Sequence, residues 1–262
     1  MNALKEILEK LAKNEISVAE AEKLVKLLAI AEIGNMARID ANRECRTAVP
    51  EIILAEGKAT RDLVEISLKM LSESGRVIVS RCEEEKMRAI KSVAPKDSVM
   101  KIYDKAKMII IKNKDFAIKS TGGKIGLLTA GTSDIPVAEE AKVVAEEMGC
   151  EVIAAYDLGV AGIHRLLEPL RNFIINDVDV VIVVAGREGA LSSVVAGMVD
   201  VPVIAVPTSN SYGFGEKGLS ALMAMLQSCS LGLAVVNIDS GVAAGAMATL
   251  IANRAAKFRN SM

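Results

Sequence analysis

The stretch Lys124-Ile-Gly-Leu-Leu-Thr-Ala-Gly-Thr-Ser-Asp-Ile-Pro136 decides the fold class of this chain. Its apolar half indicates a buried strand. Its second half indicates a turn into a helix, because Ser133 or Asp134 suits the N-cap and Pro136 suits the first helical turn. Strand and helix patterns then alternate along the rest of the chain, which predicts a doubly wound α/β fold with a parallel sheet.

Outward from this stretch, the strands and helices follow one another with short connections. The strands are expected at 124–129, 151–156, 178–185, 202–206 and 232–238. The helices are expected at 135–148, 164–174, 190–198, 217–228 and 241–257. The 262 residues are 51% hydrophobic but only 3% aromatic, so aliphatic side chains fill the core, as in a parallel sheet buried on both faces.

The N-terminal part predicts a smaller α/β domain with leading helices. Residues 2–38 show helical apolar spacing, and Ser17 with Glu20 forms a capping box. Further strands are expected at 52–54, 77–79 and 108–111, with helices at 59–73 and 83–92. The charged segment 112–124 lacks an apolar period, so we place an N-terminal domain at 1–120 and a three-layer α/β domain at 121–262.

Composition excludes several function classes. With 32 basic and 33 acidic residues, the net charge of −1 gives no reason to expect nucleic acid or a membrane surface as partner. No apolar run reaches ~18 residues without a charge or a glycine turn, so no membrane span is expected. The four cysteines, Cys45, Cys82, Cys150 and Cys229, show neither metal-ligand spacing nor a disulfide framework, so we expect a cytoplasmic protein without a metal site of its own.

Loops at the carboxyl ends of parallel strands converge on one crevice, and several polar residues are expected there. His164 is the single histidine, and Arg165 beside it suits a phosphate or carboxylate. A lone histidine is more often a structural hydrogen-bonding residue. The position of His164 after two glycines at a strand end nevertheless favours a functional role.

The turn after the first of these strands carries Gly131, Thr132, Ser133 and Asp134. Free N–H groups at a helix start can hold a phosphate, so this turn is a candidate substrate-binding segment. The alternative is that Ser133 and Asp134 only cap the helix. The turn is neither a Walker A loop nor a Gly-x-Gly-x-x-Gly fingerprint.

The next two loops add further candidates. Glu188 lies between glycines at a strand end, where it is either a helix-start carboxylate or a general base in the crevice. Gly186 before it allows a ligand close to the backbone. Thr208 and Ser209 begin a polar, glycine-rich loop, which is expected to contact ligand.

Cys229 precedes the fifth strand, which places it at the end of its own subunit opposite the crevice. It is either a small buried core thiol or a functional thiol that reaches the crevice of a neighbouring subunit. The second interpretation predicts a homo-oligomer with shared sites.

Six segments resemble those of a known family: Gly131-Thr-Ser-Asp-Ile-Pro136, Gly159-Val-Ala-Gly-Ile-His-Arg-Leu-Leu167, Ala185-Gly-Arg-Glu-Gly-Ala-Leu191, Ala205-Val-Pro-Thr-Ser209, Met225-Leu-Gln-Ser-Cys229 and Val235-Val-Asn-Ile-Asp239. Together they resemble LarB, the pyridinium-3,5-biscarboxylic acid mononucleotide synthases of nickel-pincer cofactor biosynthesis. The N-terminal motifs Arg38-Ile-Asp-Ala-Asn-Arg-Glu-Cys-Arg46, Pro50-Glu51 and Gly57-Lys58 are similar too, so the resemblance covers residues 35–255. The core also resembles N5-carboxyaminoimidazole ribonucleotide mutase, which forms octamers.

The chain departs from the LarB pattern at a few positions. Arg187 replaces a methionine and Ser192 a proline, and Ala48-Val49 replaces a Gly-Phe pair. Ser240 and Val242 replace Asn and Phe. None of these changes removes a candidate catalytic group.

The resemblance implies that the substrates are nicotinic acid adenine dinucleotide and CO2, and that AMP is released. It implies Cys229 as nucleophile, Glu188 as base and His164 as an orienting or proton-shuttling residue, in an octamer with shared sites. No organic cofactor is expected, and Mg²⁺ is the candidate ion for the phosphates. The rival interpretations are a purine-type carboxyl mutase, which needs no thiol, and a non-enzymatic dinucleotide sensor.

Overall fold

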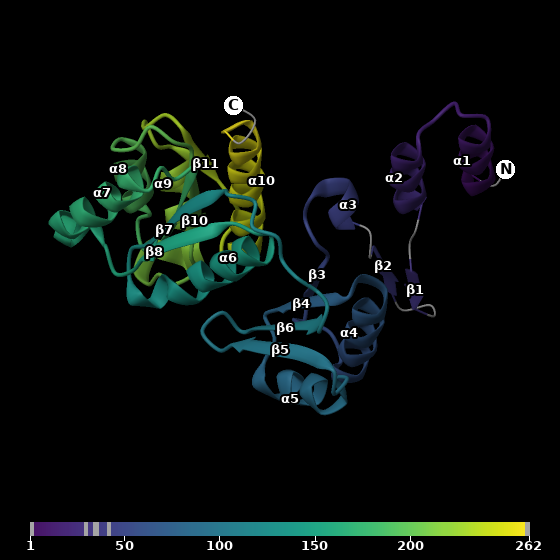
Figure 1. Ribbon diagram of the computed structural model, residues 1–262. Coiled ribbons are helices and arrows are strands. Elements are labelled where there is room, and N and C mark those ends of the chain that lie inside the picture. The colour runs from purple at the N-terminus through teal and green to yellow at the C-terminus, as the bar shows by residue number, and fades with distance from the viewer. Residues whose placement is uncertain (1–2, 29–30, 34–36, 41–42, 260–262) are drawn as a thin grey trace. The chain divides into compact units, whose positions relative to one another are not determined.

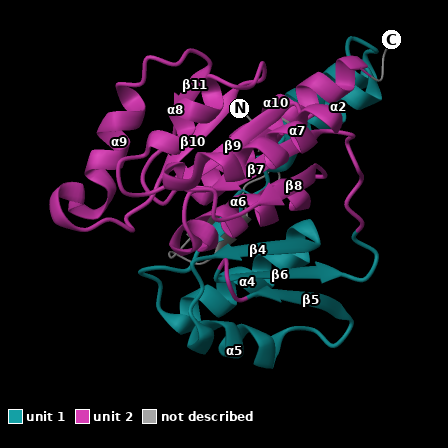
Figure 2. Ribbon diagram, turned by 90° about the vertical axis from the view of Figure 1, so that its left-hand side faces the viewer, with its two compact units in different colours: residues 1–103, 107–116 teal, residues 104–106, 117–262 magenta. Residues whose placement is uncertain are grey.

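The computed structural model describes residues 3–28, 31–33, 37–40 and 43–259. They divide into two compact units, which Figure 2 colours separately. Unit 1 comprises residues 1–103 and 107–116, and unit 2 comprises residues 104–106 and 117–262. No described helix combines the length and the apolar character that a bilayer span requires.

Unit 2 is built on a five-stranded parallel sheet (Figure 1). Its strands are β7 (Lys124–Thr129), β8 (Glu151–Ala155), β9 (Val180–Ala185), β10 (Val203–Pro207) and β11 (Leu233–Val235). Their spatial order is β11-β10-β9-β7-β8, with Leu127 of β7 opposite Ile182 of β9. Along the chain, β8 is therefore added on one side of β7, and β9, β10 and β11 are then added on the other side.

Helices cover both faces of this sheet. They are α6 (Ile135–Glu147), α7 (Leu167–Ile175), α8 (Ala190–Ala196), α9 (Leu219–Leu226) and α10 (Gly241–Arg259). In the central strand, Val180, Ile182 and Val184 belong to the core cluster with α6 and α10, whereas Val181 and Val183 belong to the cluster with α7, α8 and α9. This alternation confirms the predicted doubly wound fold, because each strand buries both of its faces.

Helix α10 lies unusually close to α6. A Cβ added to Gly241 would lie 2.3 Å from the carbonyl oxygen of Val137, and one added to Gly245 would lie 2.4 Å from that of Ala141. The buried residues of α10 are nearly all Gly and Ala. The helix therefore packs through close backbone approach rather than through large side chains.

Unit 1 contains a mixed four-stranded sheet with two helices of its own. The strands are β3 (Ile52–Leu54), β4 (Arg76–Ser80), β5 (Ser98–Tyr103) and β6 (Met108–Asn113), in the order β3-β4-β6-β5. Helices α4 (Thr60–Ser74) and α5 (Glu84–Val93) place Leu63 and Ile90 in one core cluster with Val77 of β4 and Ile109 of β6. Strand β5 was not expected from the sequence.

The leading segment differs from the predicted continuous helical region. Helices α1 (Ala3–Ala12) and α2 (Val18–Leu28) form as expected, and the capping box is confirmed because Glu20 Oε2 accepts the Ser17 N–H at 2.8 Å. The helix prediction is wrong at β1 (Ala31–Ile33) and β2 (Ala37–Ile39), which pair antiparallel. A short helix, α3 (Arg43–Thr47), follows.

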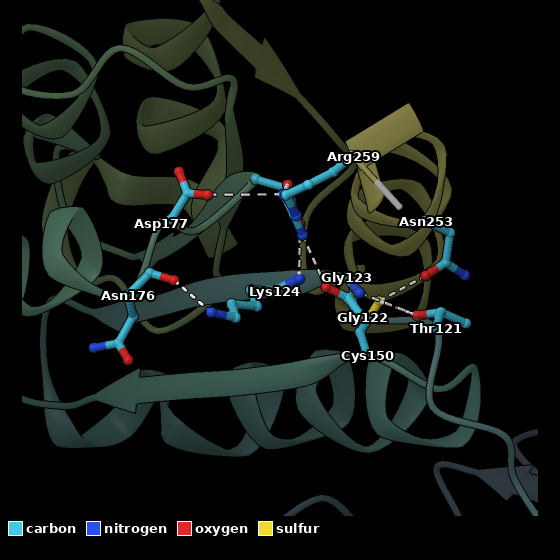
Figure 3. Close-up of polar contacts among 10 residues, drawn as sticks. Thr121, Gly122, Gly123, Lys124, Cys150, Asn176, Asp177, Asn253 and Arg259 are labelled. Atoms are coloured by element: carbon cyan, nitrogen blue, oxygen red, sulfur yellow. Dashed lines mark hydrogen bonds and ion pairs between the residues drawn. The ribbon is translucent and has the colours of Figure 1, made fainter. Parts of the chain in front are cut away.

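A polar cluster anchors the end of α10 to the start of β7 (Figure 3). Arg259 Nη1 donates to Asp179 Oδ1 at 2.7 Å, and its Nη2 donates to the Gly122 carbonyl at 2.9 Å. Asp179 Oδ2 also accepts the Lys124 N–H at 2.8 Å. The Asp179 side chain is only 4% exposed, whereas that of Asp177, 3.9 Å from the same guanidinium, is 80% exposed.

We therefore predict that Asp179→Asn lowers the free energy of unfolding by about 2 kcal/mol, because an amide nitrogen would face a buried N–H donor and the Arg259 guanidinium would lose its nearest anionic partner. Asp177→Asn is the matched control and should change it by less than about 0.5 kcal/mol. Urea denaturation measures both variants. Equal losses would contradict the assigned role of Asp179.

Candidate functional site

A cavity of about 300 Å³ opens at the carboxyl ends of β7, β8 and β9 in unit 2. The lining residues come from the loops after these strands and after β10: Ala130, Gly131, Ser133, Asp134, Gly159, Val160, Ala161, Ala185, Gly186, Arg187, Glu188, Ala190, Leu191 and Asn210. Strands β7 and β9 are the neighbours between which the direction of chain progression switches. Open α/β sheets bind ligands at this switch point.

Asp134 organises the turn that forms one wall of the cavity. Its buried Oδ2 accepts the Gly131 N–H at 2.9 Å, and its Oδ1 accepts the Thr208 hydroxyl at 2.7 Å. Since Thr208 follows β10, the second bond joins the loops after the first and fourth strands of the sheet. Both carboxylate oxygens are engaged within the protein, so Asp134 positions the turn.

Two further hydrogen bonds fix the loop after β10. Asn210 Nδ2 donates to the Ser133 carbonyl at 2.6 Å, and the Ser209 N–H donates to Asp239 Oδ1 at 2.8 Å. The bond to Ser133 is a second link, besides that between Thr208 and Asp134, from this loop to the turn after β7. The Asp239 bond links the loop to the segment after β11. The loops at this edge of the sheet are thus tied to one another.

Gly186 lies where the loop after β9 passes closest to its neighbours. A Cβ at this position would lie 2.7 Å from Thr208 Oγ1 and 2.9 Å from the Asn210 carbonyl oxygen. Only glycine fits without displacing the Asp134–Thr208 hydrogen bond.

Glu188 lies in the turn that follows Gly186. The Gly189 N–H donates to the Gly186 carbonyl at 2.9 Å and closes this turn, in which Arg187 has a left-handed backbone with φ of 53°. Glu188 is exposed and lines the cavity. Within the described part of the chain its carboxylate has no hydrogen-bond or ion-pair partner, so it is the cavity acid available to exchange a proton with a ligand.

His164 and Arg165 lie in the 3₁₀ segment η2 (Val160–Leu166) at the rim rather than in the cavity lining. His164 is exposed. Arg165 Nη1 donates to Asp157 Oδ2 at 3.1 Å and Nη2 to the Gly159 carbonyl at 3.4 Å, so its guanidinium braces its own loop. The orienting or proton-shuttling role of His164 and the ligand-binding role of Arg165 stay predictions.

The other predicted binding residues fall into two groups. Gly131, Ser133, Asp134 and Gly186 come together in the cavity wall, as Glu188 does. Thr208 is buried behind Asp134, while Thr132 and Ser209 are exposed outside the lining. Sequence reasoning missed Asn210, although it lies in the predicted polar loop. It also missed Val160, Ala161 and Leu191, which lie in the quoted family segments but whose apolar side chains give no chemical signal.

Cys229 lies between α9 and β11, at the amino edge of the sheet and hence opposite the cavity of its own unit. Its side chain is exposed. The flanking serines hold the loop on α8: Ser193 Oγ donates to Ser228 Oγ at 2.8 Å, and Ser230 Oγ donates to the Ser193 carbonyl at 2.7 Å. The sulfur is therefore presented to the outside at a fixed position.

The remaining cysteines differ in accessibility. Burial raises the pKa of Cys82 to about 11, and burial also raises the pKa of Cys150, whose Sγ lies 3.1 Å from Asn253 Oδ1. Thiolate formation at both is therefore disfavoured at neutral pH. Cys45 is exposed, in α3 of unit 1. Among the described residues, no group of three or more His, Cys, Asp or Glu side chains is arranged to hold a metal ion.

We predict that Gly186→Ala lowers the free energy of unfolding by about 1–3 kcal/mol, because the new methyl group collides with the Thr208 hydroxyl. Gly131→Ala is the control, since its Cβ would meet nothing nearer than 3.6 Å and its effect should stay below about 1 kcal/mol. Thermal unfolding of both variants measures the difference. A neutral Gly186→Ala would show that the loops do not need this close approach.

Comparisons with known proteins agree with this arrangement. Residues 124–262 match the AIR carboxylase family model, and residues 30–114 match the LarB/PurE-like N-terminal domain. An uncharacterized protein of Methanocaldococcus jannaschii is 49% identical over 251 residues, which cover 95% of this chain and 96% of that protein. The N5-carboxyaminoimidazole ribonucleotide mutase of Thermotoga maritima is 29% identical over 133 residues, or 49% of this chain and 74% of the mutase.

The corresponding mutase of Pyrococcus horikoshii is 28% identical over 140 residues, which cover 52% of this chain and 75% of the mutase. Both mutases match about half of the chain, in keeping with a shared core domain. The N-terminal match accounts for most of the remainder. The chain thus belongs to the LarB-like family, whose members combine this N-terminal domain with an AIR carboxylase core.

Proposed function

We propose that the chain is a pyridinium-3,5-biscarboxylic acid mononucleotide synthase of nickel-pincer cofactor biosynthesis. It would convert nicotinic acid adenine dinucleotide, CO2 and water to the biscarboxylated mononucleotide and AMP. The observation that carries the proposal is the Glu188 carboxylate in the wall of the switch-point cavity, beside the Gly131–Asp134 turn, where no other described residue pairs with it. Family membership supplies the carboxyl-transfer chemistry.

In this proposal, the turn after β7 receives phosphate or ribose hydroxyls. Asp134 holds the turn in place, and the backbone at Gly131 and Ser133 lines the cavity. Partial positive charge at the start of the following helix, α6, favours an anionic group there. The pyridinium ring would then lie toward the loop after β9, within reach of Glu188.

The proposed chemistry requires a thiolate because a pyridinium ring is electron-poor. The Cys229 thiolate adds to a ring carbon next to C5, and the ring becomes a neutral dienamine. The ring nitrogen then donates its electron pair toward C5, which attacks CO2 and forms the new carbon–carbon bond. Covalent catalysis of this kind divides one difficult step into easier ones.

Glu188 completes the cycle as general base. It takes the proton from C5 after carboxylation, and the electron pair of that C–H bond restores the aromatic ring as the thiolate leaves. Water cleaves the pyrophosphate in a separate step that releases AMP. Mg²⁺ would bind chiefly through the substrate phosphates, because the described residues gather no metal-ligand cluster.

The position of Cys229 adds a requirement for assembly. Within one subunit, the exposed sulfur lies at the sheet edge opposite the cavity, so the proposed adduct needs Cys229 from a neighbouring copy. We propose a homo-octamer in which each site combines Cys229 of one subunit with Glu188 of another.

A second candidate function is carboxyl transfer on an aminoimidazole ribonucleotide, as the mutases of similar sequence are named. The match of residues 124–262 to the AIR carboxylase family favours it. That reaction uses no thiol, so the effect of removing the Cys229 thiol distinguishes the two candidate functions.

We predict that the purified protein, mixed with nicotinic acid adenine dinucleotide, bicarbonate and Mg²⁺, yields AMP and a nicotinate mononucleotide heavier by one carboxyl group. Cys229→Ala should abolish this product because no ring adduct forms, whereas Cys45→Ser, at an exposed cysteine of unit 1, should retain it. Mass spectrometry of the products measures the outcome.

Unchanged dinucleotide with the wild-type protein would contradict the proposed function. Turnover of the aminoimidazole ribonucleotide by both wild type and Cys229→Ala would then establish the second candidate. Tight dinucleotide binding without turnover of either substrate would indicate a sensor.

We predict that inactive Cys229→Ala and inactive Glu188→Gln regain activity when their subunits are mixed. Random reassembly of an equal mixture gives sites with both native groups at a frequency of about one quarter, so activity should approach about one quarter of the wild-type value. The assay is product formation after dissociation and reassembly. If the mixture stays inactive while light scattering shows mixed oligomers, the shared site is wrong.

A further inference from the structure

Arg187 differs from every other residue of the cavity wall. Among the described residues that line the cavity it is the one with a cationic side chain. Within the described part of the chain, no carboxylate lies within ion-pair distance of its guanidinium. Arg165, by contrast, is already paired with Asp157 at the rim.

The contact that Arg187 does make is with an aromatic ring. Its guanidinium carbon lies 4.0 Å from the ring centroid of Tyr212, in the loop after β10. At this distance the cation interacts with the face of the ring. Tyr212 is 77% exposed, so it supports the guanidinium without enclosing it.

The backbone of Arg187 is also held from more than one side. Its left-handed φ of 53° is uncommon for a residue with a side chain, and the turn that imposes it is closed by the Gly189–Gly186 hydrogen bond. Ser220 Oγ donates to the Arg187 carbonyl at 2.9 Å. A conformation of this kind costs free energy and persists because the surrounding structure over-determines it.

We propose that Arg187, positioned by the Tyr212 ring, binds an anionic oxygen group of the ligand in this cavity, either a carboxylate or a phosphate. A guanidinium that rests on a ring face keeps the N–H groups of its edge free, and these match a planar carboxylate or a phosphate with two parallel hydrogen bonds. The inference rests on the proposed function for the choice of ligand class.

Arg187 also offsets the negative charge of the adjacent Glu188. An anionic ligand group near the Glu188 carboxylate would meet electrostatic repulsion, and Arg187 offsets it at the same turn. Arg187 is therefore a specificity-determining residue, and Tyr212 is a positioning residue that acts through it.

The test measures the binding of nicotinic acid mononucleotide and nicotinamide mononucleotide by isothermal titration calorimetry. Both probes carry a phosphate. The ring of nicotinic acid mononucleotide bears a carboxylate, whereas that of nicotinamide mononucleotide bears an uncharged carboxamide. Arg187→Met should weaken the binding of nicotinic acid mononucleotide roughly tenfold to hundredfold. Arg171→Met removes the same charge from an exposed position of α7 and should leave the affinity unchanged.

The two probes distinguish the sources of the anionic group. If Arg187 binds the ring carboxylate, Arg187→Met loses affinity for the nicotinic acid form alone. If it binds the phosphate, both mononucleotides lose affinity equally. Tyr212→Ala should lose less affinity than Arg187→Met, and for the same mononucleotide or mononucleotides. Tyr212→Phe should keep the wild-type affinity because the ring is retained.

Equal affinities of Arg187→Met and wild type for both probes would overturn the inference, as would failure of the wild-type protein to bind either probe. Binding that depends on Arg187, in a protein that forms no carboxylated product, would uphold this inference and refute the proposed function. If the protein forms the carboxylated product but Arg187→Met binds both mononucleotides as the wild type does, the proposed function stands and this inference is refuted.

Discussion

The hydrogen bond between Asp134 and Thr208 is the constraint on which the candidate site depends. It crosses from the loop after β7 to the loop after β10, and it passes over Gly186 of the intervening β9 loop. Because Asp134 also accepts the Gly131 N–H, one buried carboxylate sets the shape of the turn and its distance from the neighbouring loops. Glu188 and Arg187 then occupy a wall whose other side is already fixed.

The parallel sheet imposes a second constraint, which concerns the thiol. Every strand-to-helix loop of unit 2 lies at the edge with the cavity, and every helix-to-strand loop lies at the opposite edge. Cys229 belongs to the second kind, so no local adjustment of its loop could bring it to the cavity of the same subunit. A mechanism that uses both Cys229 and Glu188 therefore makes assembly part of the chemistry.

Sequence reasoning worked best where periodicity and length were long enough to be distinctive. The strands and helices of unit 2 were predicted in order, because each strand buries two apolar faces and each helix begins near a glycine-containing turn. It failed at β1 and β2, because strands of three residues are too short to show a period of their own after an amphipathic helix. It also missed β5, whose alternation of half-buried and exposed residues gives a weak signal in isolation.

The sequence by itself determined the fold class, the family resemblance and the loops that meet at the switch point, because these follow from hydrophobic patterning and from local turn chemistry. Only the tertiary structure decided which polar groups are engaged and which are free. Asp134 is saturated by Gly131 and Thr208, and Arg165 is paired with Asp157, whereas Arg187 rests on the ring of Tyr212. These partners come from separate loops, and their contacts arise only when the sheet brings the loops together.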